Sequence, residues 1–130
     1  MTLFFARFGL NYFLGMIMRN INGLKKNEQF QRVYRKKKIC SNDLLISYTA
    51  GNGLDLSRIG ISVSKKTGNS IVRHRVTRLI REAYRLHKEE LAGGYDIIVA
   101  ARPASANAGY KEVEAAYLNV LKRQGCLKRD

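Results

Sequence analysis

The segment from Ser70 to Leu91 constrains the fold most, because it combines helical periodicity with a dense run of arginine. Placed at about 100° per residue, its apolar side chains fall on one stripe: Val72, Val76, Leu79, Ile80, Ala83 and Leu86. A second face and its flanks carry the basic side chains His74, Arg78, Arg81, Arg85, Arg73 and Arg75. The sequence therefore predicts a long helix that buries the stripe, displays the arginines and stops at Gly93 and Gly94.

Three short runs have the composition of β-strands. Residues 44–49 and 59–64 are rich in β-branched and aromatic side chains and flank the turn-forming residues 50–53, which predicts antiparallel strands. In residues 59–64, small side chains share one face, and this indicates that another element lies against them. Residues 95–101 are almost continuously apolar, as in a strand that is covered on both sides.

Two further helices complete the pattern. Residues 27–38, for which Asn27 is the predicted N-cap, bring three side chains to one face: Phe30, Val33 and Tyr34. Residues 110–124 repeat apolar side chains at helical spacing and end at Gly125. The element order is α-β-β-(β)-α-β-α, with a third strand possible, which predicts a single α+β domain.

Residues 1–22 differ from the rest of the chain. They are rich in Phe, Leu and Met, but Arg7 and Asn11 interrupt them before the roughly 20 apolar residues that span a bilayer. They do not follow the pattern of a secretory signal, although a weak signal or an interfacial helix stays open, and Met16 and Met18 offer alternative starts. We therefore divide the chain into an N-terminal extension at 1–22, a folded domain at 23–125 and a C-terminal tail at 126–130.

The sequence lacks the residue combinations of a protein-based active site. Cys40 and Cys126 lie far apart and the chain has 2 histidines, which argues against a zinc site and predicts reduced thiols in the cytoplasm. The acidic residues, including Asp96, are scattered beside basic ones, where we expect solvated charge pairs. No nucleophile with a base, catalytic carboxylate pair or Gly-rich phosphate loop is recognisable. We therefore expect no catalytic residues in this chain.

The charge balance indicates the class of partner. The chain has 24 Lys and Arg residues against 10 Asp and Glu, a formal net charge of +14, and its 45% hydrophobic residues can form a core. A partner with dense negative charge follows, either nucleic acid or an anionic membrane surface. Arginine dominates residues 65–88, where Glu82 is the only acid, so we expect nearly unpaired guanidinium groups that bind phosphate.

A second basic cluster surrounds two aromatic rings. Phe30 and Tyr34 lie one helical turn apart, among the basic residues Lys25, Lys26, Arg32, Arg35, Lys36, Lys37 and Lys38. Either the rings belong to the core, or they line a groove with Tyr48 on which the bases of a single strand stack. Two basic surfaces would let the protein bridge two RNA elements.

The run SVSKKTGNSIVRHRVTRLIREAYR, residues 62–85, resembles the signature of the bacterial ribonuclease P protein component. The similarity extends to residues 24–38, 46–49 and 95–105, and so covers roughly residues 23–123. The family motif usually reads Arg-Asn-Arg, whereas this chain has His74 between Arg73 and Arg75.

The resemblance implies a small two-layer sandwich similar to the ribosomal protein S5 domain 2-like fold, with a left-handed β-α-β crossover. It implies a protein that binds the catalytic RNA of ribonuclease P and the 5′ leader of precursor tRNA, and that assists endonucleolytic removal of the leader. The residues expected to bind the catalytic RNA are Lys65, Lys66, Asn69, Arg73, His74, Arg75, Arg78, Arg81 and Arg85. Those expected to bind the leader are Phe30, Tyr34, Tyr48 and Lys37.

The same resemblance implies that the RNA carries the chemistry. Mg²⁺ is then held mainly by the RNA subunit, and none is bound by the protein alone. The implied partners are the catalytic RNA and precursor tRNA in the cytoplasm, without a membrane or a further protein. The alternative is a ribosomal or general structured-RNA-binding protein without a role in tRNA processing.

Overall fold

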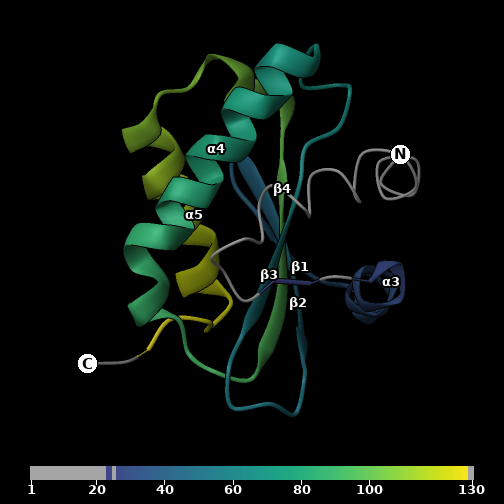
Figure 1. The fold of residues 1–130 in the computed structure, drawn as a ribbon. Coiled ribbons are helices and arrows are strands. Elements are labelled where there is room, and N and C mark those ends of the chain that lie inside the picture. Colours follow the sequence, from purple (N-terminus) through teal and green to yellow (C-terminus); the bar gives the residue numbers. More distant parts are fainter. Residues whose placement is uncertain (1–22, 25, 129–130) are drawn as a thin grey trace.

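Figure 1 shows the computed structural model, which describes residues 23–24 and 26–128 of the chain. The predicted N-terminal extension lies outside the described residues, as do Lys25 and residues 129–130. The described helices and strands are, in chain order, α3 (Asn27–Lys36), β1 (Lys38–Ser41), β2 (Leu45–Gly51), β3 (Arg58–Ser62), α4 (Ser70–His87), β4 (Tyr95–Ala101) and α5 (Tyr110–Arg123). Short 3₁₀ turns, η3 (Lys88–Glu90) and η4 (Pro103–Asn107), follow α4 and β4.

The strands form one four-stranded sheet in the order β1-β2-β4-β3. β2 is antiparallel to both β1 and β4, and β3 is parallel to β4. The predicted strands at 44–49 and 59–64 do run in opposite directions, but they are not neighbours, because the apolar β4 lies between them. Residues 52–57 accordingly form an open connection across the end of β4, where Asn52 N–H donates to Gly94 O at 2.9 Å. The possible third strand of the prediction is β1.

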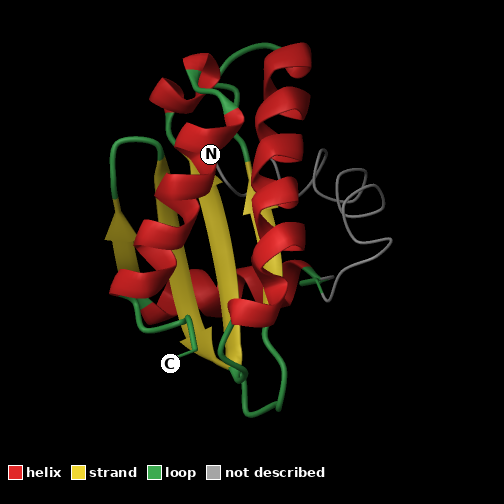
Figure 2. Cartoon of the chain, turned by 90° about the vertical axis from the view of Figure 1, so that its left-hand side faces the viewer, coloured by secondary structure: helices red, strands yellow, loops and turns green. Residues whose placement is uncertain are grey.

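Helices cover both faces of the sheet. α4 and α5 lie on one face and α3 lies on the other (Figure 1). The small side chains of β3 face α3, as the sequence predicted: a Cβ atom added at Gly60 would lie 2.5 Å from the ring of Phe30. α4 joins the parallel strands β3 and β4 as a crossover with the left-handed sense that the resemblance implied (Figure 2). Most such crossovers are right-handed.

The helix ends differ slightly from the prediction. Lys26, not Asn27, is the N-cap of α3. This helix ends two residues early because Lys37 adopts a left-handed conformation, with φ of 54°, and turns the chain into β1. α4 ends at His87 rather than Leu91, and η3 continues it as a tighter turn.

The apolar stripe of α4 is confirmed except at its C-terminal end. Val76, Ile80 and Ala83 are fully buried, whereas Leu86 is 51% exposed. Tyr84, which was not assigned to the stripe, is buried with an exposure of 3%. The reason is the position of α5, which packs on the side of α4 that carries His87, so Leu86 faces away from it.

Residues at the C-terminal end are bonded to the folded domain. Ala92 N–H donates to Cys126 O at 2.8 Å, and Lys128 N–H donates to Glu90 O at 2.7 Å. Cys126 is buried and Cys40 is half-buried, and both thiols are free. None of the described helices has the length and apolar character needed to cross a bilayer.

Candidate RNA-binding surfaces

The turn before α4 presents two lysines. Lys65 and Lys66 are exposed, and the turn closes through a hydrogen bond from Gly68 N–H to Lys65 O at 3.2 Å. Glycine is required at position 68, because a Cβ atom there would lie 2.9 Å from the side chain of Val72. Asn69 caps α4, and its side-chain oxygen accepts from Val72 N–H at 3.0 Å. The turn and the helix start are thus built as one unit.

Three arginines of α4 are hydrogen-bonded, but among them only Arg85 forms an ion pair within the described residues, with Glu82. Arg73 donates to Gly68 O at 3.0 Å, and Arg75 donates to Ala108 O at 3.0 Å and also to Ala106 O. Arg85 forms a bidentate ion pair with Glu82, with distances of 2.8 and 2.7 Å. Arg73 and Arg75 therefore hold the lysine turn and the η4 segment against α4, besides carrying charge.

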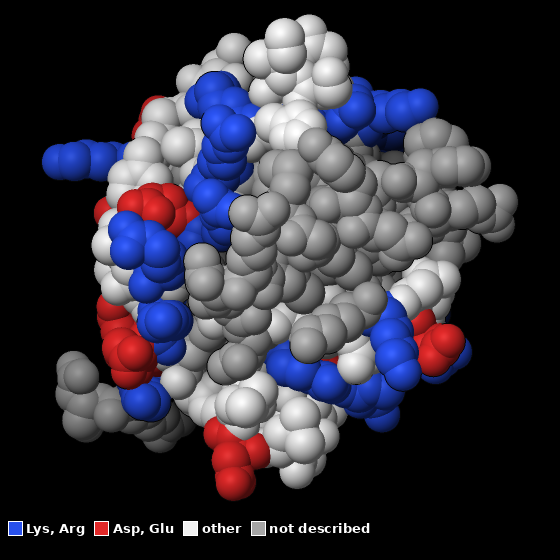
Figure 3. Space-filling model, in the orientation of Figure 1, with Lys and Arg blue, Asp and Glu red and all other residues white. Residues whose placement is uncertain are grey.

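Basic groups nevertheless line the surface of α4. Arg78 is exposed and makes no hydrogen bond or ion pair with any described residue, while His74 and Arg81 are half-buried. Lys and Arg side chains follow α4 down the molecule (Figure 3). The α4 surface is defined here as the side chains of Lys65, Lys66, Arg73, His74, Arg75, Arg78, Arg81 and Arg85. This surface offers several guanidinium and ammonium groups to phosphates.

A second candidate surface lies where α3 meets the sheet. Tyr34 of α3 and Tyr48 of β2 are both half-buried, with ring centroids 4.8 Å apart and ring planes at 76°. Beside them, Ile39 of β1 pairs with Tyr48 in register and is 55% exposed. Lys37 is exposed at the end of α3. Tyr34, Tyr48, Ile39 and Lys37 form what we call the α3 surface.

Phe30 does not belong to the α3 surface, which corrects its predicted role in leader binding. Its side chain is 2% exposed and fills the space above Gly60, so its ring faces are covered by the core. The two rings therefore differ: Phe30 belongs to the core, whereas Tyr34 is half-buried and keeps part of its ring exposed beside Tyr48.

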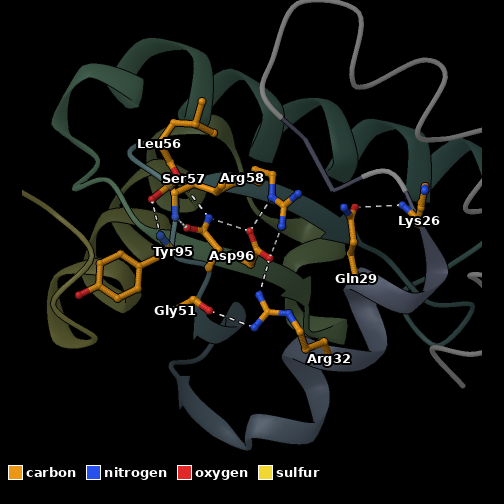
Figure 4. A network of polar contacts seen from close by, with 11 residues as sticks. Lys26, Gln29, Arg32, Gly51, Leu56, Ser57, Arg58, Tyr95 and Asp96 are labelled. Atoms are coloured by element: carbon orange, nitrogen blue, oxygen red, sulfur yellow. Dashed lines mark hydrogen bonds and ion pairs between the residues drawn. The ribbon is translucent and has the colours of Figure 1, made fainter.

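A buried charge network attaches α3 to the sheet (Figure 4). Asp96 of β4 is 0% exposed and accepts from Arg58 at 2.8 Å on each carboxylate oxygen. It also accepts from Arg32 of α3 at 2.7 Å and from Asn52 at 3.0 Å. Burial raises the pKa of this carboxyl, but the hydrogen bonds from Arg58, Asn52 and Arg32 together outweigh burial and hold the pKa below its ordinary value.

The network corrects the expectation that Asp96 forms a solvated pair, and sequence reasoning missed Arg32 and Arg58 as its partners. One signal was available: a carboxylate stands second in an otherwise apolar strand, and a buried charge requires partners. The sequence could not say which cations those are, because they come from α3 and β3.

A histidine cluster links α4 to α5. His87 bonds to Glu114 at 2.7 Å and also contacts Glu90, and Tyr110 donates to the same Glu114 oxygen at 3.1 Å. These two carboxylates, Glu114 first, raise the pKa of His87. Burial and the Glu114 carboxylate raise the pKa of Tyr110 to about 12. The cluster therefore acts as a link between helices.

The described residues do not fit a protein-held magnesium site. Within 23–24 and 26–128, no group of three or more His, Cys, Asp or Glu side chains is arranged so that it could hold a metal ion. Both oxygens of Asp96, the buried carboxylate, are already taken by Arg58, Arg32 and Asn52. The location of Mg²⁺ on the RNA stays a prediction.

Comparison with known proteins shows the family. The model of the family described as Ribonuclease P matches residues 18–125. The ribonuclease P protein component of Alkaliphilus oremlandii is 48% identical over 110 residues, covering 85% of this chain and 96% of the relative. The corresponding protein of Clostridium botulinum is 46% identical over 105 residues, covering 80% and 95%.

Solved structures agree with the sequence relatives. The RNase P protein of Staphylococcus aureus superposes with a TM-score of 0.76 at 36% identity, covering 82% of this chain and 98% of that one. The RNase P protein of Thermotoga maritima gives 0.72 at 30% identity, covering 78% and 96%. Fold, motif and relatives agree, and the chain belongs to the ribonuclease P protein family.

Proposed function

We propose that this protein binds the catalytic RNA of ribonuclease P through its α4 surface and the 5′ leader of precursor tRNA through its α3 surface. The observation that carries the proposal is the placement of the two surfaces. The helix α4 and the helix α3 lie on opposite faces of the same sheet (Figure 1). One small domain can therefore contact two RNA elements at once.

The α4 surface suits the backbone of a structured RNA. The exposed groups of Arg78, Lys65 and Lys66 can each neutralise a phosphate and release counterions, which makes binding depend strongly on salt. Arg73 and Arg75 are held in place by backbone carbonyls, so their remaining N–H groups are oriented before RNA arrives. Guanidinium groups that are fixed in this way lose less conformational entropy on binding.

The α3 surface suits an unpaired strand. Tyr34 and Tyr48 offer aromatic area for base stacking, which is tolerant of sequence, and Lys37 supplies a charge at its edge. A leader is single-stranded, whereas mature tRNA lacks it. The two tyrosines therefore give a physical basis for preferring precursor over product.

In this proposal the RNA holds the magnesium ions and carries out cleavage, and the protein lowers the electrostatic cost of bringing two polyanions together. Each phosphate that is neutralised at the α4 surface reduces repulsion within the complex. A cytoplasmic location belongs to the same proposal, because precursor tRNA is processed there.

The test compares two substrates. The affinity of the complex of protein and catalytic RNA is measured for precursor tRNA and for mature tRNA, with the catalytic RNA alone as the reference. We expect the protein to strengthen precursor binding selectively. Equal strengthening of both tRNAs would favour a general structured-RNA-binding protein.

A further inference from the structure

The attachment of α3 to the sheet differs on its two sides. The side chains that face the sheet, Phe30 and Val33, are buried in the core. Arg32 and Tyr34 flank Val33 at about 100° to either side around the helix axis. Arg32 reaches the Asp96 carboxylate on one side, and Tyr34 meets Tyr48 on the other. The ion pair and the aromatic contact therefore hold opposite flanks of one short helix.

The Arg32 guanidinium joins α3 to two strands at once. One nitrogen donates to Asp96 of β4 at 2.7 Å, and the other donates to Gly51 O at the end of β2 at 3.0 Å. Figure 4 shows the guanidinium between these two acceptors. The Arg58 guanidinium holds the same carboxylate from β3, which fixes the direction in which Asp96 faces Arg32.

A roll of α3 about its buried side would move both flanks. For a helix with a radius of about 5 to 6 Å including side chains, a roll of about 10° displaces a side chain by roughly 1 Å. A displacement of that size is enough to misalign a stacked base. The ion pair opposes this roll because it anchors the flank opposite Tyr34.

We propose that Asp96 is a positioning residue for leader binding: through its ion pair with Arg32, it sets the orientation of α3 and hence the geometry of the Tyr34–Tyr48 surface. The inference rests on the proposed function of the α3 surface. Asp96 cannot act by touching RNA, because its side chain is 0% exposed. It is also an anion, so direct electrostatics would make it oppose RNA binding.

The experiment uses the full chain bound to catalytic RNA and measures the ratio of precursor to mature tRNA affinity over a series of salt concentrations. Arg32→Ala is the primary variant, because Arg58 and Asn52 still bond to the Asp96 carboxylate and we therefore expect the variant to fold. Asp96→Asn is the second, and Arg32→Lys tests rescue by a cation. Lys122→Ala removes one exposed charge from α5 and serves as the charge control. Tyr48→Ala reports whether the α3 surface binds the leader at all.

We expect Arg32→Ala to lower the precursor-to-mature ratio by roughly fivefold or more, the range of one lost base stack. Its affinity for catalytic RNA and its salt slope should match those of Lys122→Ala, and Arg32→Lys should recover part of the ratio. Asp96→Asn makes the protein more positive, which would strengthen RNA binding if charge alone mattered. We expect it to weaken leader binding instead.

Three outcomes would overturn the inference. The first is that Tyr48→Ala lowers the precursor-to-mature ratio but Arg32→Ala leaves it unchanged. A salt slope that falls by about 0.7 to 0.9 in Arg32→Ala would show that Arg32 contacts a leader phosphate itself. If Asp96→Asn folds and its precursor-to-mature ratio is unchanged, Asp96 is not a positioning residue for leader binding. An unchanged ratio in Tyr48→Ala would instead count against the proposed function of the α3 surface.

Discussion

Tyr34 of α3 and Tyr48 of β2 meet edge to face, with ring centroids 4.8 Å apart and ring planes at 76°. Aromatic pairs favour this arrangement over a face-to-face sandwich. The contact joins a helix to a strand at the edge of the α3 surface, and both rings keep part of their area exposed. One pair of side chains thus contributes to packing and offers a stacking surface.

Removing the ring of Tyr48 should weaken binding of precursor tRNA more than binding of mature tRNA. Each lost base stack is worth about 1 to 3 kcal/mol. Equilibrium binding of Tyr48→Ala to both tRNAs, in the complex with catalytic RNA, measures the difference. Tyr48→Phe keeps the ring and should retain the preference for precursor. Equal losses for both tRNAs in Tyr48→Ala would mean that the ring is only structural.

Replacing Arg78 with Ala and replacing Arg75 with Ala should have different effects on RNA binding and on stability. Arg78→Ala should weaken binding to catalytic RNA and reduce the slope of log affinity against log salt by about 0.7 to 0.9, since one exposed phosphate contact is lost. Arg75→Ala should also destabilise the protein by about 1 to 3 kcal/mol, because it removes the bonds to Ala106 and Ala108. Salt titrations and denaturant unfolding separate the two effects. An unchanged slope in Arg78→Ala would remove that residue from the interface.

Substitution of Gly60 should test the packing of α3 on β3. A Cβ atom there would lie 2.5 Å from the Phe30 ring, and overpacking of this kind costs about 1 to 3 kcal/mol. Gly51→Ala is the matched control, because its nearest neighbour would be 4.0 Å away. Denaturant unfolding of Gly60→Ala and Gly51→Ala should therefore differ. Equal stability would mean that α3 does not pack as described.

The link between α4 and α5 should depend on pH through His87. Its pKa lies above the ordinary 6.5 because Glu114 and Glu90 bond to the ring. Because the pKa of His87 is higher in the folded than in the unfolded protein, its protonated form stabilises the fold fully below about pH 6.5. This stabilisation is lost as the pH rises through the pKa of the folded state. The pKa of Glu114 is lowered from 4.5, chiefly by His87, so its contribution is present above 4.5 and lost as the pH falls through the folded value.

Unfolding curves over a pH series, with His87→Gln beside the parent protein, measure this contribution. We expect the parent to lose stability as the pH rises above 6.5, and the variant to lose less over the same interval. A loss of the same size in His87→Gln would assign the pH dependence to other groups.

Local sequence patterns predicted the helices and strands well, but they did not predict the order of the strands in the sheet. Val76 and Ile80 follow the period of α4 so clearly that the helix and its buried side were evident. Gly60 marked the close approach of another element, which is Phe30. Residues 44–49 and 59–64 were expected to be antiparallel strands joined by a turn, but neighbouring sequence does not determine that β4 lies between them.

The candidate site was predicted by residue type but not by geometry. The arginines of α4 were identified from the sequence, yet their carbonyl partners belong to segments that only the fold brings close, as with Arg75 and Ala108. Phe30 and Tyr34 looked alike at helical spacing, and only the packing of α3 shows that one is buried and the other partly exposed. Asp96 was visible as a charge in an apolar strand, but its partners come from three other segments.

The most direct test of the proposed function is cleavage of precursor tRNA by the catalytic RNA at low magnesium, with and without this protein. We predict that the protein raises kcat/KM for precursor tRNA under these conditions, and that the protein without the RNA cleaves nothing. Cleavage by the RNA at the same rate with and without the protein would contradict the account.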